Sequence, residues 1–228
     1  MQAIRLIAHE IYPMSQITLQ TVRDFELALG LVSGALQKLA TAASHSFGHD
    51  CYLHMEFGHA LLADLGFRTE YVLGYSAWRV GDREPDVVSH VPFGRIIPSS
   101  NGEKGFDYHA WLSWQGHVID FTTYQLRLKV MELDAFEGGC TSVTWCPDFL
   151  LLAHGEIRTF LQVVKGVRPG MAYYEARPEL RAQFGPAVDL DADALSAARL
   201  LIANPDMGVI GPYSAVRGEA QGPRSQRI

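Results

Sequence analysis

The hydrophobic period of the chain changes at Gly66, and this change constrains the fold more than any other feature. Before Gly66, apolar residues recur every three to four positions over residues 22–39 and again over residues 51–65, as in amphipathic helices. The glycine itself, followed by Phe67, is typical of a helix C-terminus. The segments after it are rich in aromatic and branched residues, which favour strands. The sequence therefore predicts an α+β fold, with a helical N-terminal part packed on an antiparallel β-sheet.

The later pattern completes one domain. Strands are expected over residues 71–80, 87–97, 107–114 and 117–123. Residues 149–153 and 158–164 fit either a strand or a short helix, whereas residues 172–184 and 192–203 fit helices. Because no linker interrupts this pattern, we expect a single domain over residues 1–212 and a flexible C-terminal tail over residues 213–228.

The composition argues against several classes of protein. The 228-residue chain carries 19 Lys and Arg against 25 Asp and Glu, whereas a nucleic-acid binder usually shows a basic excess. It contains no apolar run of about 20 residues, the length that spans a membrane. No glycine-rich phosphate-binding loop is present, and three cysteines are too few for a disulfide framework. We therefore expect a cytoplasmic protein that binds no cofactor, nucleic acid or membrane, with its oligomeric state open.

Cys51 stands at the predicted start of the second helix, directly after Asp50, a favourable N-cap residue. The free amides and the dipole at a helix N-terminus stabilise a thiolate, which is the nucleophilic form of cysteine. The position alone also fits a small buried hydrophobic residue, which is the usual role of a lone cysteine in a reduced protein.

A predicted hairpin brings a histidine and an aspartate together. If Gln115 and Gly116 form a two-residue loop, Trp111 faces Asp120, and His109 lies diagonally across from Asp120 on the same face. Diagonal neighbours are about 7–8 Å apart, a distance that two side chains can close. The carboxylate would then fix the tautomer of the imidazole, as in a Cys-His-Asp arrangement. A three-residue loop would place Asp120 on the opposite face.

Two stretches resemble known families. The stretch from Cys51 to Tyr75 resembles the nucleophile helix and following strand of transglutaminase-like proteins and arylamine N-acetyltransferases. Tyr108-His-Ala-Trp-Leu and Gly116-His-Val-Ile-Asp-Phe-Thr122 resemble the histidine and aspartate strands of the transglutaminase-like group. Both families belong to the papain-like cysteine proteinase superfamily, and the resemblance points to a small bacterial family within it. It covers residues 50–123 and departs from the acetyltransferases in lacking Arg-Gly-Gly before the cysteine.

The resemblance implies a papain-like fold and a thiol-dependent acyl-transfer enzyme. It implies Cys51 as the nucleophile, His109 as the general base and acid, and Asp120 as the residue that orients His109. The substrate would carry an amide or another acyl group, and the reaction would be hydrolysis, deamidation or acyl transfer. His45 and His49 stand where an oxyanion donor is expected, and Trp111 shares the predicted face of His109, which makes all three candidates for contacts with the substrate or the oxyanion.

Two other functions stay open from the sequence. Without a clear second oxyanion donor, the chain fits a non-catalytic binding or interaction module on a papain-like scaffold. Cys51 with His45 and His49 also fits a zinc site, although no complete zinc-ligand spacing is present.

Overall fold

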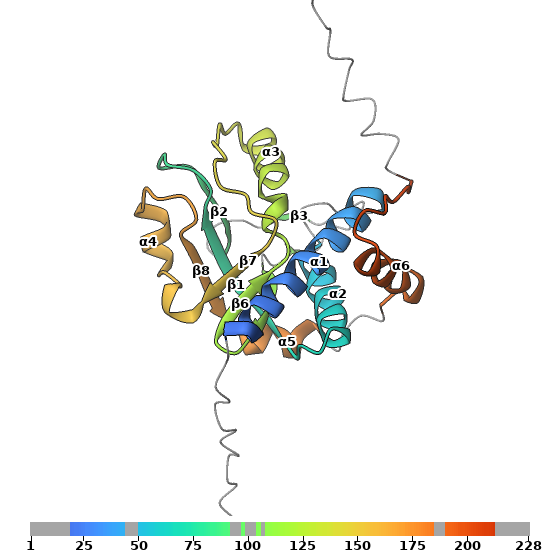
Figure 1. The fold of residues 1–228 in the computed structure, drawn as a ribbon. Helices are drawn as coiled ribbons and strands as arrows, with labels where there is room; N and C mark the ends of the chain where they lie inside the picture. Colours follow the sequence, from blue (N-terminus) through green and yellow to red (C-terminus); the bar gives the residue numbers. More distant parts are fainter. Residues whose placement is uncertain are drawn as a thin grey trace, which may run out of the picture.

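The computed structural model describes residues 19–43, 50–91, 97–98, 104–105, 108–184 and 190–212 (Figure 1). The helices are α1 (Leu19–Ala43), α2 (Cys51–Asp64), α3 (Leu126–Glu137), α4 (Phe160–Lys165), α5 (Pro178–Phe184) and α6 (Ala192–Ala203), with 3-10 turns η1 (Thr123–Gln125) and η2 (His154–Glu156). The strands are β1 (Glu70–Arg79), β2 (Val87–His90), β3 (Ile97–Pro98), β4 (Lys104–Gly105), β5 (His109–Trp114), β6 (His117–Asp120), β7 (Leu150–Ala153) and β8 (Ala172–Ala176). These elements confirm the predicted α+β class.

The main sheet is antiparallel and curled. Its strand order is β2-β1-β5-β6-β7, and β8 also pairs with β1. The strand β8 corrects the prediction, because residues 172–184 were expected to be one helix. The alternating segment Ala172-Tyr-Tyr-Glu-Ala176 instead forms a strand, and only the part from Pro178 onward is helical. The helix α3 was not predicted, and residues 213–228, expected to be a tail, lie outside the described residues.

β2 and β5 pair with successive parts of the same edge of β1, as the two halves of one longer strand would. Gly74 of β1 pairs with His109 on β5 and with Ala176 on β8, so β5 and β8 lie at opposite edges of β1. Ser76 pairs with His90 on β2 and also with β8. Both β2 and β5 therefore lie at the edge of β1 that β8 does not occupy, one after the other. As a result, His90 and His109 occupy successive positions on the same face of the sheet.

The β5–β6 hairpin has the predicted register. Trp114 pairs with His117, and Leu112 pairs with Ile119. Gln115 and Gly116 have φ angles of 45° and 77°, and the type I′ turn of a two-residue hairpin requires positive values at both positions. This turn confirms the parity on which the expected meeting of His109 and Asp120 depends.

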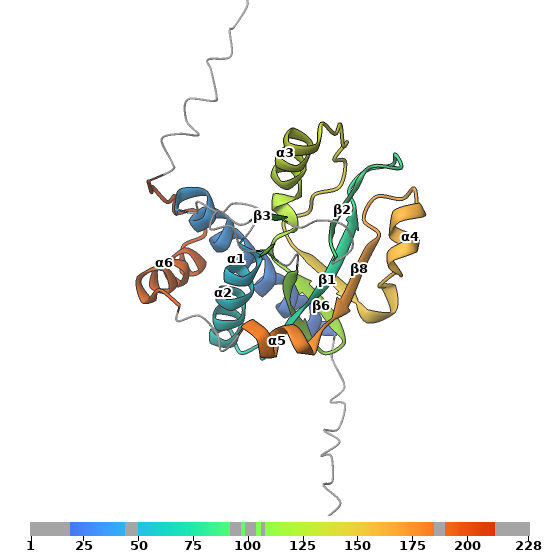
Figure 2. The same cartoon turned by 180° about the vertical axis from the view of Figure 1, so that it is seen from behind.

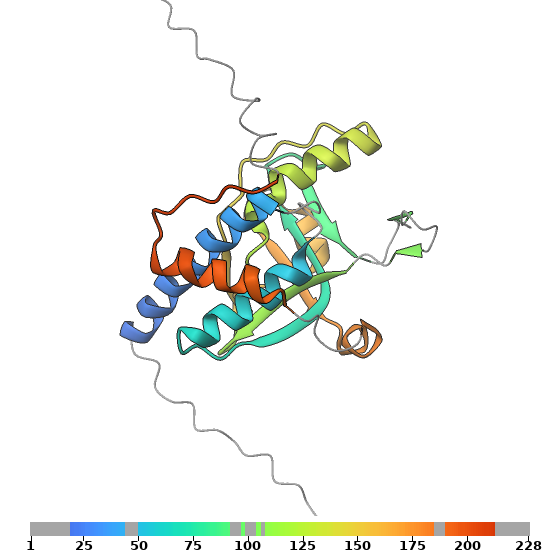
Figure 3. The same ribbon diagram turned by 90° about the vertical axis from the view of Figure 1, so that its right-hand side faces the viewer.

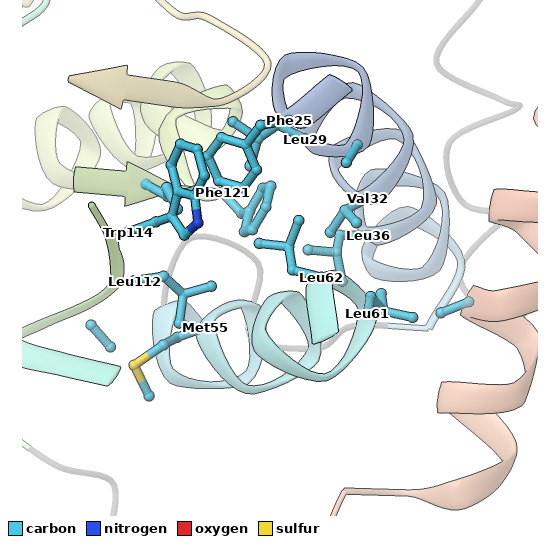
Figure 4. Close-up of a cluster of buried hydrophobic side chains, with 14 of the residues drawn as sticks. Phe25, Leu29, Val32, Leu36, Met55, Leu61, Leu62, Leu112, Trp114 and Phe121 are labelled. Atoms are coloured by element: carbon cyan, nitrogen blue, oxygen red, sulfur yellow. The ribbon is translucent and has the colours of Figure 1, made fainter. Parts of the chain in front are cut away.

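Each face of the sheet has its own hydrophobic core. On one face, α1 and α2 bury residues against β5 and β6; Figure 4 shows Phe25, Leu29, Val32, Leu36, Met55, Leu61, Leu62, Leu112, Trp114 and Phe121 in this cluster. The stripe of α1 confirms the predicted helical period. The other face holds a second cluster of buried residues, composed of Trp78, Val80, Val88, Trp111, Val118, Leu126, Val130, Ala172 and Tyr174.

The helices are arranged around this sheet in two groups. α1, α2 and α6 lie together on one side, where α1 contacts both α2 and α6 (Figures 2 and 3). α4 lies on the other side, beside β8 (Figure 2). α2 packs against β5, and Cys51 at its start is close enough to His109, the first residue of β5, to affect the pKa of that residue. None of the helices in the described part of the chain has the length and apolar character needed to cross a membrane.

Candidate active site

His109 and Asp120 form a buried ion pair. Nε2 of His109 donates a hydrogen bond to Oδ2 of Asp120 over 2.8 Å, and the two residues are 1% and 0% exposed. Both side chains point to the same face of the sheet because the hairpin register places them diagonally across from each other. Gly74, which pairs with His109, makes room for the Trp111 ring and the backbone of β8, since a Cβ at this position would lie 2.7 Å from Cη2 of Trp111 and 2.0 Å from the backbone oxygen of Glu175.

The Asp120 carboxylate accepts hydrogen bonds at both oxygens. Oδ1 accepts from the backbone N–H of Thr122 over 2.8 Å and from the Thr122 hydroxyl over 2.7 Å. Oδ2 accepts from His109 and from the hydroxyl of Tyr174 over 2.7 Å. Tyr174 in turn accepts a hydrogen bond from Nε1 of Trp78 over 2.8 Å. Four donors therefore stabilise the negative charge of a carboxylate that water does not reach.

The pair titrates far from the ordinary values of its members. Burial alone would raise the pKa of Asp120, but the charge and hydrogen bond of His109, together with the two bonds from Thr122, lower it to about 2. Burial likewise disfavours a charged imidazole, yet Asp120, assisted by Cys51, raises the pKa of His109 to about 10. The arrangement therefore favours an imidazolium beside a carboxylate over a wide range of pH.

Cys51 lies at the start of α2 and close to this pair. Its side chain is half-buried, and it contributes to the raised pKa of His109. It also contributes, after burial, to the pKa of Tyr108, which is raised to about 12. Nδ1 of His109 is buried and has no hydrogen-bond partner among the described residues. The ring nitrogen that Asp120 leaves free is thus available to the neighbouring thiol.

A second network holds the first turn of α2. Asp50 occupies the N-cap position, but its side chain makes no cap hydrogen bond, which corrects the expected capping role. Its carboxylate instead lies 3.4 Å from Nδ1 of His54, and this nitrogen also lies 3.0 Å from the Asp50 carbonyl oxygen. Nε2 of His54 meets the hydroxyl of Tyr124 at 2.8 Å. His54 therefore ties the turn that carries Cys51 to η1, directly after β6.

Aromatic rings enclose His109. The Trp78 ring meets it edge-on, with ring centroids 4.9 Å apart and an interplanar angle of 88°. The ring of His90 stacks on it at 5.3 Å and 16°, as the successive pairing of β2 and β5 with β1 requires, and Trp111 lies 6.0 Å away. These rings pack around the imidazole, whose Nε2 faces Asp120.

The structure brings three of the predicted residues together, namely Cys51, His109 and Asp120. Trp111 also lies beside His109, but it is only 4% exposed and packs in the second core, so it offers no surface to a substrate. His45 and His49, the other oxyanion candidates and the suggested zinc ligands, lie outside the described residues. Among the described residues, no group of three His, Cys, Asp or Glu side chains could hold a metal ion.

The site also contains three residues that the sequence does not indicate, namely Tyr174, Trp78 and His90. Tyr174 lies in a segment predicted as a helix, although the two tyrosines between Gly170 and Pro178 favour a strand. His90 shares the alternation of Val88 within its strand, which places both on one face, but nothing local indicates that the next residue on this face is His109. These residues come together through pairing between strands that are far apart in the sequence, and no local sequence pattern indicates such pairing.

Comparisons with known proteins assign no family to the chain. No protein-family model matches it, and no curated protein matches it. Among solved structures, the crystal structure of a genomics target is similar, with 13% sequence identity, 82% of each chain covered and a TM-score of 0.48.

Proposed function

We propose that the protein is a thiol-dependent acyl-transfer enzyme on a papain-like scaffold, with Cys51 as the nucleophile, His109 as the general base and acid, and Asp120 as the orienting residue. The observation that carries this proposal is the buried hydrogen bond between His109 and Asp120, beside a half-buried thiol at a helix N-terminus. A fixed imidazole next to an accessible cysteine is the arrangement that activates a thiol for attack on a carbonyl.

The reaction would proceed in two steps. The Cys51 sulfur attacks the acyl carbonyl carbon, and the bond to the leaving group breaks as that group takes a proton from His109, which leaves a thioester on Cys51. His109 then removes a proton from water or an acceptor amine as that nucleophile attacks the thioester, and the proton returns to the Cys51 sulfur when the thioester breaks. The backbone N–H of Cys51, at the positive end of the α2 dipole, is suited to stabilise the developing oxyanion.

Two further features support this assignment. Nucleophile, base and orienting residue follow one another in the chain in the order of the transglutaminase-like group, and a helix carries the first while a hairpin carries the other two. The three cysteines, Cys51, Cys140 and Cys146, are all free, which suits a reducing compartment such as the cytoplasm.

An activated ester tests the proposal without knowledge of the natural substrate. The protein is mixed with p-nitrophenyl acetate, and the release of p-nitrophenolate is followed together with the mass of the intact protein. We expect a burst of about one equivalent of p-nitrophenolate and an acetyl group on Cys51, since acyl-enzyme accumulation is the kinetic sign of a covalent intermediate. Cys51→Ala should abolish the burst, whereas Cys140→Ala, at the exposed cysteine, should retain it.

The opposite outcome is equally informative. If the folded protein releases no burst and acquires no acetyl group on Cys51, the thiol is not poised for acyl transfer. The chain would then be a binding module that keeps the arrangement of an enzyme without its chemistry.

A further inference from the structure

Tyr174 and His109 compete for one oxygen of Asp120. The Tyr174 hydroxyl lies 2.7 Å and Nε2 of His109 lies 2.8 Å from the same atom, Oδ2. The hydroxyl and the backbone N–H of Thr122 both donate to the other oxygen, Oδ1. A change in the hydrogen bond from Tyr174 therefore alters the charge on Oδ2, the oxygen that accepts the hydrogen bond from His109.

Tyr174 is fixed as a donor toward the carboxylate. The Nε1–H group of Trp78, which can only donate, points at the Tyr174 oxygen, so the phenol proton is left for Asp120. Burial, followed by the charge of Asp120, raises the pKa of Tyr174 well above its ordinary value, so the hydroxyl keeps its proton. The hydrogen bond from Trp78 also polarises the phenol and makes it a stronger donor.

We propose that Tyr174 is a positioning residue that reduces the stabilisation of the charged His109 ring by Asp120. This inference rests on the proposed function. A hydrogen bond to a carboxylate is stronger when no cation already shares its charge. The Tyr174 bond is therefore stronger when His109 is neutral than when it is an imidazolium. The Tyr174 hydrogen bond thus offsets part of the stabilisation that the carboxylate gives to the charged ring. It thereby favours release of the proton that the ring must give to the leaving group.

Other groups that face the ring come from several elements. In the described part of the chain they are Cys51 from α2, His90 from β2, Asp120 from β6 and Tyr174 from β8. A test must keep the other three positions identical in the proteins that it compares, while it changes only the phenol. The Tyr174→Phe substitution does so, because it removes only the hydroxyl group and keeps the ring that packs against Trp111, with centroids 5.1 Å apart.

The experiment is a titration of His109 by NMR in the full chain, with histidine labelled in its ring nitrogens. It is carried out in a Cys51→Ala background, which removes the thiol contribution to the raised pKa of His109 and makes the test independent of thiol chemistry. We expect Tyr174→Phe to raise the pKa of His109 by roughly one, the size of one altered hydrogen bond to a charged group. The proton on Nε2 should also resonate further downfield, because its bond to Asp120 strengthens.

Tyr173→Phe is the matched control. Tyr173 is the preceding residue of β8, and its hydroxyl bonds Glu175 rather than Asp120. This variant should leave the titration of His109 unchanged. If Tyr174→Phe fails to fold, Trp78→Phe serves in its place: it removes the donor that polarises the phenol, and it should shift the titration in the same direction by a smaller amount.

Two results would overturn the inference. One is a folded Tyr174→Phe variant in which His109 titrates as in the parent protein or with a lower pKa. The other is an equal shift in Tyr173→Phe, which would show a general effect of the substitution on β8. Neither result bears on the acylation of Cys51, so failure of this inference is distinguishable from failure of the proposed function.

Discussion

Asp120→Asn is expected to remove most of the thiol reactivity and several kcal/mol of stability together. The amide keeps an oxygen for the two Thr122 donors, so its NH2 group then occupies the position of Oδ2. There it faces two further donors, the Tyr174 hydroxyl and the Nε2–H group of His109. Breaking a buried pair by removing one partner costs about 3–5 kcal/mol, because the remaining groups stay buried without their partner.

The same substitution also reverses the imidazole tautomer. Nε2 of His109 can satisfy the new amide only by losing its proton and accepting a hydrogen bond, which transfers the proton to Nδ1. In this tautomer the neutral ring carries its proton on Nδ1, so Nδ1 cannot act as a base toward Cys51. We therefore expect the alkylation rate of Cys51 at pH 6 to approach that of a cysteine without a partner, and chemical denaturation should show the loss of stability.

Asp134→Asn is the control for this prediction. Asp134 likewise accepts hydrogen bonds from a threonine hydroxyl and a backbone N–H, both of Thr141, but it lies on α3 and is not part of the His109 pair. The Asp134→Asn substitution should lower the stability by about 1 kcal/mol and leave the alkylation of Cys51 unaffected. A variant Asp120→Asn that alkylates as fast as the natural sequence would remove Asp120 from the proposed site.

The stability of a Cys51→Ala variant should fall as the pH rises above neutrality. His109 binds its proton more tightly in the folded state, with a pKa of about 10 against 6.5 in the reference state, so its contribution is complete below pH 6.5 and is lost through pH 10. In Cys51→Ala, which removes the opposing ionisation of the thiol, the folded state binds the extra proton within that window, and stability should decline by about 1.4 kcal/mol per pH unit. Asp120 has the opposite linkage, because its pKa is lowered from 3.8 to about 2, and its contribution is lost only as the pH falls through that range.

Removal of the carboxylate should invert this dependence. In Asp120→Asn, burial of His109 favours the neutral ring, so the unfolded state binds the extra proton below pH 6.5 and stability should rise with pH there. Urea unfolding of Cys51→Ala, with and without Asp120→Asn, at pH 5, 7 and 9 measures the two slopes. Equal slopes in the two proteins would mean that His109 and Asp120 do not share a charge in solution.

The hairpin could be predicted from the sequence because its information is local. A glycine in a two-residue loop fixes the turn, the turn fixes the parity, and the parity decides that His109 and Asp120 share a face. The start of α2 at Cys51 could be predicted for the same reason, since the helical period and Gly66 lie within one segment. Each of these predictions uses fewer than about 20 neighbouring residues, within which sequence patterns are most informative.

The remainder of the site depends on contacts between distant segments. Tyr174 reaches Asp120 only because β8 pairs with β1, almost 100 residues earlier in the chain. His90 reaches His109 because β2 and β5 pair one after the other along the same edge of β1. The tyrosine-rich segment of β8 has strand propensity, but its neighbour Pro178 also opens a helix, and the tertiary pairing with β1 decides between them. Neither contact has a local sequence pattern.

Alkylation of the natural sequence with iodoacetamide between pH 5 and 9, with each modified cysteine located by peptide mass spectrometry, tests the central claim most directly. A thiol with an ordinary pKa near 8.5 becomes about 75 times more ionised between pH 6 and pH 8, and its rate follows. Cys140, which is exposed, is the cysteine with which Cys51 is compared in the same molecule, whereas Cys146 should react slowly because its thiol lies 3.3 Å from two carbonyl oxygens.

If Cys51 is activated by His109, its alkylation should already be fast at pH 6 and nearly constant up to pH 8, and His109→Ala should restore the steep profile of Cys140. A Cys51 rate that rises in parallel with that of Cys140, unchanged by His109→Ala, would contradict the account and show that the neighbouring imidazole does not activate the thiol.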